Sequence, residues 1–234
     1  MNDPDGLLGV VAALAVEARA LGPAAQRPDG LAALGDGALL AVSGMGASLA
    51  AIAARNLVAA GASRLLSFGL AGGLDPRLRA GVVVLPSEVI SRAGPRFATA
   101  QPWCAQLRRA LGDRGPVTAG SLLGSDAPIQ SVADKARAFR ETGAVAVDME
   151  SLAIAEVAAA HRLPFVAARV IVDTAADVLP RAVVAAGGAG QVDMRRLIVA
   201  LAAAPFDWLA LLRLAVRYRA ATRSLLAVAA ARAA

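Results

Sequence analysis

The sequence predicts an α/β protein, a three-layer sandwich in which helices cover both faces of a mainly parallel central sheet. Two observations lead to this prediction: short apolar runs typical of buried strands alternate with helical patterns, and turns rich in small residues separate them. The chain of 234 residues is long enough for one large domain, and its hydrophobic content of 57% excludes a disordered protein.

The strands are predicted from apolar runs without polar alternation, because a strand in a parallel sheet is buried on both faces. The helices follow from apolar residues at three- to four-residue spacing, and Gly61 ends the second helix at a position that needs a positive φ. A glycine-rich loop is expected over 69–73, after the third strand. The expected strands are 7–13, 39–43, 65–68, 82–85, 117–122, 144–147 and 165–172, and the expected helices are 16–21, 48–60, 103–111, 132–140 and 150–161.

Composition excludes several function classes. Of the 24 basic residues only Lys135 is not arginine, and the arginines are spread along the chain without interleaved aromatic residues, so we expect no nucleic-acid partner despite the net charge of +6. Cys104 is the only cysteine and His161 the only histidine, so we expect no disulfide and no metal site. Residues 1–5 are acidic where a secretory signal is basic, and a reducing cytoplasm is the expected compartment.

Two glycine-containing segments follow predicted strands. Gly44 and Gly46 lie between a strand and a helix, where backbone N–H groups and the helix dipole can hold an anion. For this segment alone, a tight turn that needs only small residues is the simpler interpretation, and Leu49 stands where a dinucleotide fingerprint has its third glycine. Together with the loop over 69–73, which contains Gly72, the segment suggests a phosphate or sugar site.

Four acidic residues lie beside apolar runs, where burial would require a partner or a chemical task. Glu17 follows the first strand, Asp148 and Glu150 end a strand and open a helix, and Asp173 ends the last strand. Each of them alone is explained equally well as a helix cap or a solvated loop residue. All four map to the edge of the sheet where ligands bind in α/β proteins, and we therefore expect them to form one site.

Six segments follow one another over residues 7–178: LAVEA at 14–18, SGMG at 43–46, GLAGGLDP at 69–76, SDA at 125–127, VDMES at 147–151 and RVIVD at 169–173. Taken in this order they resemble the nucleoside phosphorylase and nucleosidase superfamily, and the resemblance implies its fold. The best-known similar pattern is that of methylthioadenosine/S-adenosylhomocysteine nucleosidase, and within the superfamily the sequence looks most like the hopanoid-associated phosphorylases, also called adenosylhopane nucleosidases.

The resemblance implies cleavage of a ribosyl–adenine bond, which requires protonation of the leaving base and shelter for a cationic sugar. Asp173 would protonate N7 of adenine or donate a hydrogen bond to it. Glu150 would accept hydrogen bonds from the ribose hydroxyls and, with Met149, seat the sugar. Asp148 and Gly72 would complete the substrate-binding surface.

The resemblance leaves the nucleophile open. Glu17 occupies the position that activates the attacking water in nucleosidases, which favours hydrolysis. A phosphorylase would instead take inorganic phosphate as co-substrate, held by Gly44, Gly46 and an arginine such as Arg19. Neither route implies a cofactor.

Three departures from the family pattern make the predicted pocket more apolar. Leu70 replaces a small hydroxyl residue beside the nucleophile, Val172 replaces the serine common before the catalytic aspartate, and Pro128 and Ile129 stand where a base-stacking aromatic often lies. These changes suit a bulky hydrocarbon on the 5′ side, as in adenosylhopane. A general methylthioadenosine/S-adenosylhomocysteine nucleosidase and a purine-binding protein without turnover are the alternatives.

Residues 179–234 lie beyond the resemblance and are expected to form an arginine-rich helical extension, with a loop over 182–190 and a helix over 194–204. After Pro205 an apolar stripe contains Leu211, Leu214, Tyr218 and Leu225, opposite Arg213 and Arg217. Two interpretations stay open: a helix packed on the domain, or an interfacial helix in peripheral contact with an anionic membrane. Because relatives are usually dimers or larger, the resemblance also implies a homo-oligomer.

Overall fold

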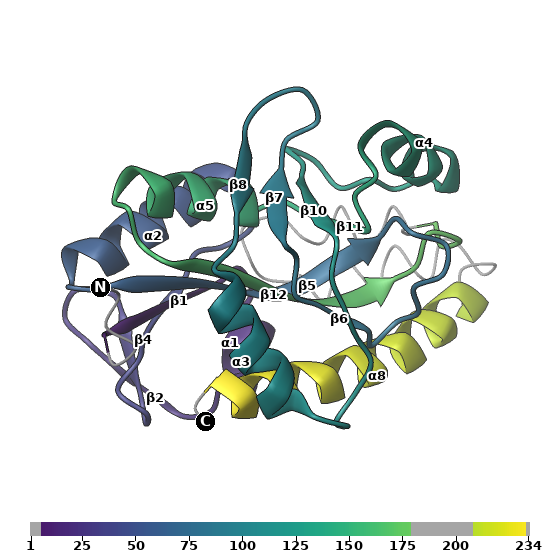
Figure 1. Cartoon of the computed structure of the whole chain (residues 1–234). Coiled ribbons are helices and arrows are strands. Elements are labelled where there is room, and N and C mark those ends of the chain that lie inside the picture. The colour runs from purple at the N-terminus through teal and green to yellow at the C-terminus, as the bar shows by residue number, and fades with distance from the viewer. Residues whose placement is uncertain (1–5, 179–207, 233–234) are drawn as a thin grey trace.

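The predicted apolar runs assemble into one sheet. The computed structural model of the protein describes residues 6–178 and 208–232, and twelve strands join the sheet within them (Figure 1). The strands are β1 (Leu8–Ala12), β2 (Ala24–Gln26), β3 (Ala32–Leu34), β4 (Leu39–Val42), β5 (Arg64–Gly73), β6 (Val83–Val84), β7 (Glu88–Ile90), β8 (Arg96–Ala98), β9 (Val117–Thr118), β10 (Ser121–Gly124), β11 (Ala146–Asp148) and β12 (Phe165–Asp173). The helices are α1 (Ala15–Ala20), α2 (Ala47–Ala59), α3 (Gln101–Leu111), α4 (Val132–Thr142), α5 (Ser151–Ala160) and α8 (Trp208–Arg232).

The centre of the sheet is parallel, which confirms the predicted fold class. β1 pairs in parallel with β4 and β5, β5 pairs in parallel with β12, and β10 pairs in parallel with β7 and β11. The antiparallel pairs include the short strands β2, β3 and β8, which the apolar-run criterion did not find. The far end of β5 also pairs antiparallel with β11, so β5 joins the two halves of the sheet.

Side-chain alternation along the strands supplies a core on each face of the sheet. On β1, for example, Val10 packs toward α3 and α8 whereas Val11 packs toward α2 and α5. In Figure 1, α2 and α5 lie over one face of the sheet, and α1, α3 and α8 lie over the other. A third, smaller cluster joins Ala138 of α4 to Leu123 and Val147, and thereby places α4 beside the ends of β10 and β11.

The expected glycine loop over 69–73 is wrong, because β5 continues as a strand to Gly73. Gly69 and Leu70 pair with β12, and Gly72 and Gly73 pair with β11, so the glycines lie inside the sheet. Gly69 has a φ of +159°, and a Cβ atom there would lie 2.5 Å from both Glu17 Oε1 and Arg169 Nη1. Glycine is needed at this position because two polar side chains press against the backbone.

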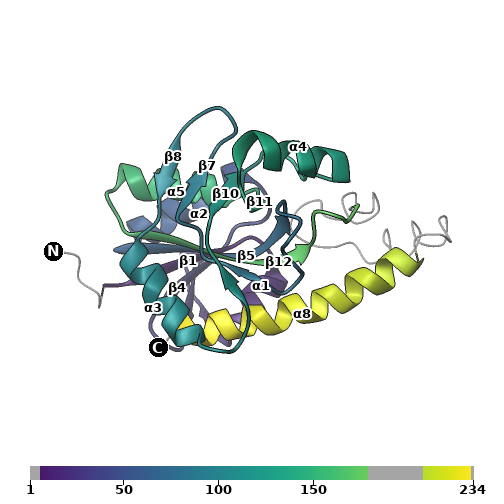
Figure 2. The ribbon, with the colours of Figure 1, turned by 45° about the vertical axis from the view of Figure 1, so that its right-hand side comes forward.

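The C-terminal helix α8 packs on the domain along the half whose side chains are described. Leu225 and Val228 are buried in the same core cluster as Val10 of β1, and α8 crosses the face that also carries α3 (Figure 2). Arg217 does not face solvent freely, because it forms an ion pair with Asp177. The loop expected over 182–190, the helix expected over 194–204 and the side chains of Leu211, Arg213 and Leu214 lie outside the described part. Among the described helices, none is long and apolar enough to cross a membrane.

Candidate active site

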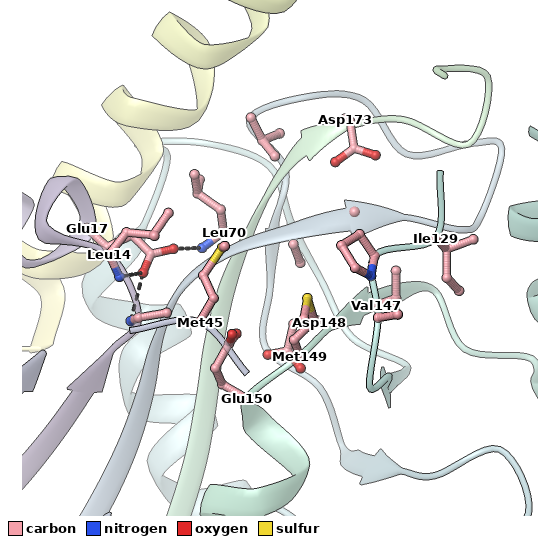
Figure 3. Close-up of a pocket in the computed structure, with 16 residues that line it drawn as sticks. Leu14, Glu17, Met45, Leu70, Ile129, Val147, Asp148, Met149, Glu150 and Asp173 are labelled. Carbon is pink, nitrogen blue, oxygen red and sulfur yellow. Dashed lines mark hydrogen bonds between the residues drawn. The ribbon is translucent and has the colours of Figure 1, made fainter. Parts of the chain in front are cut away.

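A cavity of about 260 Å³ opens where the carboxyl ends of the central strands converge (Figure 3). Its walls come from the ends of β5, β11 and β12 and from segments that follow β1, β4, β10 and β11, so residues distant in sequence meet at one edge of the sheet. The lining residues are Ala13, Leu14, Glu17, Met45, Leu70, Ala71, Gly72, Ala127, Pro128, Ile129, Val147, Asp148, Met149, Glu150, Val172 and Asp173.

Nine of the twelve site residues expected from the sequence line this cavity. The other three, Arg19, Gly44 and Gly46, are outside the lining. Arg19 is exposed at the end of α1, whereas the turn of Gly44 and Gly46 borders the site because the Gly46 N–H donates to Glu150 Oε1 at 2.9 Å. The turn therefore contacts a carboxylate of the protein itself. The nine lining residues are Glu17, Leu70, Gly72, Pro128, Ile129, Asp148, Met149, Glu150 and Asp173.

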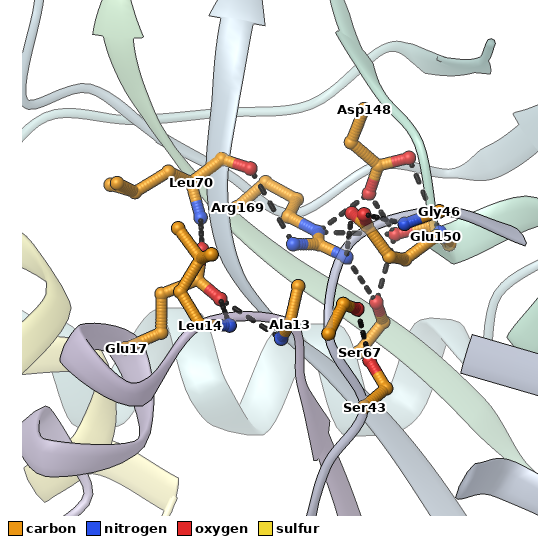
Figure 4. A network of polar contacts seen from close by, with 12 residues as sticks. Ala13, Leu14, Glu17, Ser43, Gly46, Ser67, Leu70, Asp148, Glu150 and Arg169 are labelled. Atoms are coloured by element: carbon orange, nitrogen blue, oxygen red, sulfur yellow. Dashed lines mark hydrogen bonds and ion pairs between the residues drawn. The ribbon is translucent and has the colours of Figure 1, made fainter. Parts of the chain in front are cut away.

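Glu17 is buried because its carboxylate satisfies backbone donors at the start of α1. Its Oε2 accepts hydrogen bonds from the N–H groups of Ala13 (3.0 Å) and Leu14 (2.9 Å), and its Oε1 accepts one from Leu70 (2.8 Å) (Figure 4). Burial raises the pKa of Glu17 above its usual range, and the charge of Arg169 and these three donors offset only part of the rise. A carboxylate has about four acceptor positions, so one stays available for a ligand or water.

Arg169 is the cation at the centre of the site, where it lies behind the cavity wall. Its Nε lies 2.6 Å from Asp148 Oδ2, its Nη2 lies 3.8 Å from Glu150 Oε2, and Nη2 also donates to Ser67 Oγ at 2.6 Å (Figure 4). Burial lowers the pKa of Arg169, but the neighbouring carboxylates raise it by more, so the guanidinium stays charged. Burial also raises the pKa of Glu150, and Arg169 opposes that effect.

Asp173 lies at the opposite end of the cavity from Glu17, with Glu150 and Met149 between them in Figure 3. Asp173 Oδ2 accepts a hydrogen bond from Lys135 Nζ, and both side chains are buried. Burial raises the pKa of Asp173, and the charge and hydrogen bond of Lys135 counteract part of the rise. This carboxyl can exchange a proton with a bound molecule at one end of the cavity while Glu17 acts at the other.

Sequence reasoning missed the roles of Arg169 and Lys135. Arg169 interrupts an otherwise apolar strand, and Lys135 is the single lysine of an arginine-rich chain. Both features mark residues that would be costly to bury without a partner. Their carboxylate partners are 19 to 38 positions away in sequence, so only the fold reveals the pairs. In residues 6–178 and 208–232, no group of three His, Cys, Asp or Glu side chains is placed to hold a metal ion.

Solved structures with a similar fold include nucleosidases and a futalosine hydrolase. The 5′-methylthioadenosine/S-adenosylhomocysteine nucleosidase of Neisseria meningitidis, in complex with methylthio-immucillin-A, superposes with a TM-score of 0.70 at 22% identity, over 97% of this chain and 98% of that one. A putative methylthioadenosine nucleosidase of Weissella paramesenteroides gives a TM-score of 0.68 at 18% identity, over 97% and 99%. The futalosine hydrolase of Helicobacter pylori gives 0.65 at 16% identity, over 85% and 98%.

A comparison with curated protein sequences gives no match. A family model, by contrast, covers most of the chain: the model of the phosphorylase superfamily matches residues 31–203. This match confirms, at the level of the superfamily, the prediction of an enzyme of the nucleosidase and nucleoside phosphorylase type. With the parallel sheet, the cavity at its carboxyl edge and the carboxylates that line it, the match establishes that the chain belongs to the phosphorylase superfamily.

Proposed function

We propose that the protein hydrolyses the N-glycosidic bond of a 5′-substituted adenosine and releases adenine. The observation that carries this proposal is the placement of three buried carboxyl groups along one cavity, with Asp173 at one end, Glu17 at the other and Glu150 between them. The names of the structural neighbours, which include nucleosidases and a futalosine hydrolase, support the same reaction class.

Asp173 acts on the leaving group. Adenine leaves slowly as an anion, so a proton delivered to the base in the transition state lowers the barrier. The raised pKa of Asp173 brings its protonated form closer to neutral pH, as this role requires. Pro128 and Ile129 offer apolar surface for the base at the same end of the cavity.

Glu150 and Met149 hold the ribose. The sugar becomes oxocarbenium-like as the bond to adenine breaks, and a carboxylate in a water-poor cavity stabilises that positive charge more strongly than bulk water does. Asp148 shares Arg169 with Glu150 and so helps to fix the orientation of this carboxylate.

Water, rather than phosphate, is the proposed nucleophile. The described lining of the cavity contains four acidic residues and no Lys or Arg, and the guanidinium of Arg169 is already engaged with Asp148 and Glu150. A phosphate dianion would meet net negative charge there. Glu17, whose pKa is raised by burial, is a stronger base than an exposed carboxylate and keeps one acceptor position for water.

Adenosylhopane is the proposed substrate, with methylthioadenosine and S-adenosylhomocysteine as the alternative. Apolar side chains, Leu14, Met45 and Leu70, surround Glu17 (Figure 3). A cavity of about 260 Å³ lies below the roughly 300–1,000 Å³ of drug-sized ligand sites, so it can take the nucleoside but not a triterpenoid chain. The hydrocarbon would leave through the cavity mouth, and we propose a cytoplasmic enzyme in peripheral contact with the membrane that holds it.

The deciding experiment measures adenine release from adenosylhopane and methylthioadenosine in parallel, each with and without phosphate. We expect release from adenosylhopane without phosphate. Release from methylthioadenosine alone would select the alternative substrate, dependence on phosphate would select phosphorolysis, and binding of adenosine analogues without adenine release would indicate a binding protein.

Replacing the proposed acid tests the leaving-group step. Asp173→Asn should lower turnover by about 10²-fold or more, the scale of general-acid catalysis. Near-normal turnover by the folded variant would remove Asp173 from the mechanism.

Replacing the proposed base tests the nucleophile. Glu17→Gln should abolish adenine release but leave the affinity for an adenosine analogue nearly unchanged, because the lost group acts on water rather than on the substrate. Circular dichroism should accompany this test, since Glu17 also accepts three backbone hydrogen bonds. Full activity in Glu17→Gln would contradict the proposed role.

A further inference from the structure

Lys135 is a fully buried cation behind the wall of the cavity. It lies on α4, which flanks the end of β12 on the side opposite α8 (Figure 2). Its side chain has 0% exposure, and its ammonium group donates to Asp173 Oδ2, to the Thr174 carbonyl at 2.8 Å and to the Asp177 carbonyl at 3.1 Å. An ammonium group has three donors, so all of them are used.

We propose that Lys135 is the positioning residue of the proposed hydrolysis, which fixes the Asp173 carboxyl with Oδ2 held inside the protein and Oδ1 presented to the substrate base. This inference rests on the proposed function. Lys135 itself does not line the cavity and has no donor left for a ligand, so it acts on the reaction only through Asp173. Within the described residues, no side chain donates to Asp173 Oδ1.

The turn that follows β12 keeps the ammonium group of Lys135 next to the Asp173 carboxylate. The Asp177 carboxylate accepts hydrogen bonds from the Thr174 N–H (2.8 Å) and hydroxyl (2.7 Å), and it forms an ion pair with Arg217 of α8. The turn therefore keeps the two carbonyl groups that receive Lys135 at fixed positions. Lys135 of α4 and Arg217 of α8, which lie on opposite sides of β12, therefore both bind the turn over 174–177.

The charge of Lys135 also sets the pH at which Asp173 loses its proton. Burial raises the pKa of Asp173, Lys135 lowers it, and Asp177 raises it again, while Arg217 faces Asp177. Among the described residues, Asp173 pairs with uncharged Gly72 of β5, and Gly72 in turn pairs with uncharged Val147 of β11. Activity that needs protonated Asp173 is lost as pH rises through this pKa, so removing Lys135 should move the alkaline limb to higher pH.

The test compares Lys135→Met, Lys135→Arg and the control Arg137→Met in the full chain. Arg137 lies on the same helix but is exposed, with its ion pair to Asp134 on the surface. The first readout is the titration of the Asp173 carboxyl by ¹³C NMR of aspartate-labelled protein, with Asp173→Asn to assign the signal. The second is the pH dependence of kcat and KM for adenine release.

In Lys135→Met the NMR midpoint of Asp173 and the alkaline limb should both rise by about 1 to 3 pH units, the usual effect of one adjacent charge. kcat should fall by up to about 10²-fold, the scale for a misplaced catalytic group, with KM nearly unchanged. Lys135→Arg, which keeps the charge, should retain the wild-type NMR midpoint. The control Arg137→Met should retain both the midpoint and the alkaline limb of the wild type. Should Lys135→Met fail to fold, Lys135→Arg still provides the test, because a shifted midpoint in that variant would contradict the proposal.

A midpoint and pH profile of Lys135→Met equal to those of the wild type would overturn the proposal. An unshifted profile with a lower yield of folded protein would likewise show a purely structural role. If the wild type releases no adenine from any substrate, the hydrolytic function fails by itself, whereas the NMR titration still decides whether Lys135 controls Asp173.

Discussion

Arg169→Met should destabilise the protein strongly. In the described structure, Arg169 is the only cation that forms ion pairs with Asp148 and Glu150. Arg169 and Asp148 are each 1% exposed at the side chain, and Arg169 Nε lies 2.6 Å from Asp148 Oδ2. Methionine fills much of the same volume but leaves Asp148, Glu150 and Glu17 without their neighbouring positive charge.

The size of the effect follows from the geometry. At 2.6 Å and an effective dielectric constant of about 20, the Coulomb attraction of Arg169 and Asp148 is about 6 kcal/mol. The variant no longer has to desolvate a guanidinium, which offsets part of this loss. Breaking a buried ion pair by removing one partner costs about 3–5 kcal/mol, and for a protein of this size that corresponds to a fall in Tm of roughly 6–20 °C.

The destabilisation should depend on pH with a defined sign. Burial raises the pKa values of Glu17 and Glu150 and Arg169 opposes the rise, so without Arg169 the folded pKa values of these two groups lie still further above the unfolded ones. Stability is then retained below the unfolded pKa values of about 4 and lost as pH rises through the folded ones. Arg169→Met should therefore be closest to the wild type in acid and furthest from it at neutral and alkaline pH.

Urea unfolding followed by circular dichroism at pH 5 and pH 8 measures both effects. The matched control is Arg96→Met, which breaks the surface pair of Arg96 with Glu88, where Arg96 is 59% exposed, and should change stability by at most about 1 kcal/mol. The reasoning is refuted if Arg169→Met costs no more than the control, or if its deficit grows toward acid pH.

Two further predictions concern close packing. Gly69→Ala should cost about 1–3 kcal/mol in unfolding free energy and lower activity, since its Cβ would lie 2.5 Å from Glu17 Oε1, whereas Gly35→Ala, with no atom within 4 Å, should change neither. Equal urea midpoints for the two variants would contradict this explanation. Leu225→Ala should cost about 2–5 kcal/mol because Leu225 is 2% exposed in the core, whereas Leu226→Ala should cost about 0.5 kcal/mol or less because Leu226 is 51% exposed. If thermal melts show equal costs, α8 does not pack as described.

The order of strands and helices and the edge that carries the site could be predicted from the sequence. Strand burial and helix periodicity are encoded within a few residues, and the carboxyl ends of parallel strands meet at one edge whatever their lateral order. For this reason Glu17, Glu150 and Asp173 were expected together, and they line one cavity. The family motifs strengthened this expectation, because each falls at the end of a strand.

Only the tertiary structure decided which cations neutralise these carboxylates. It also decided that residues 69–73 form part of a strand and that the C-terminal helix α8 packs on the domain. Arg169 contacts Asp148 across the sheet, Lys135 reaches Asp173 from another helix, and Arg217 reaches Asp177 from the C-terminal helix. Residues 69–73 extend a strand because β11 and β12 pair with them. Such partners are set by long-range pairing and by the cost of leaving a buried charge alone, and neither quantity can be read from local sequence periodicity.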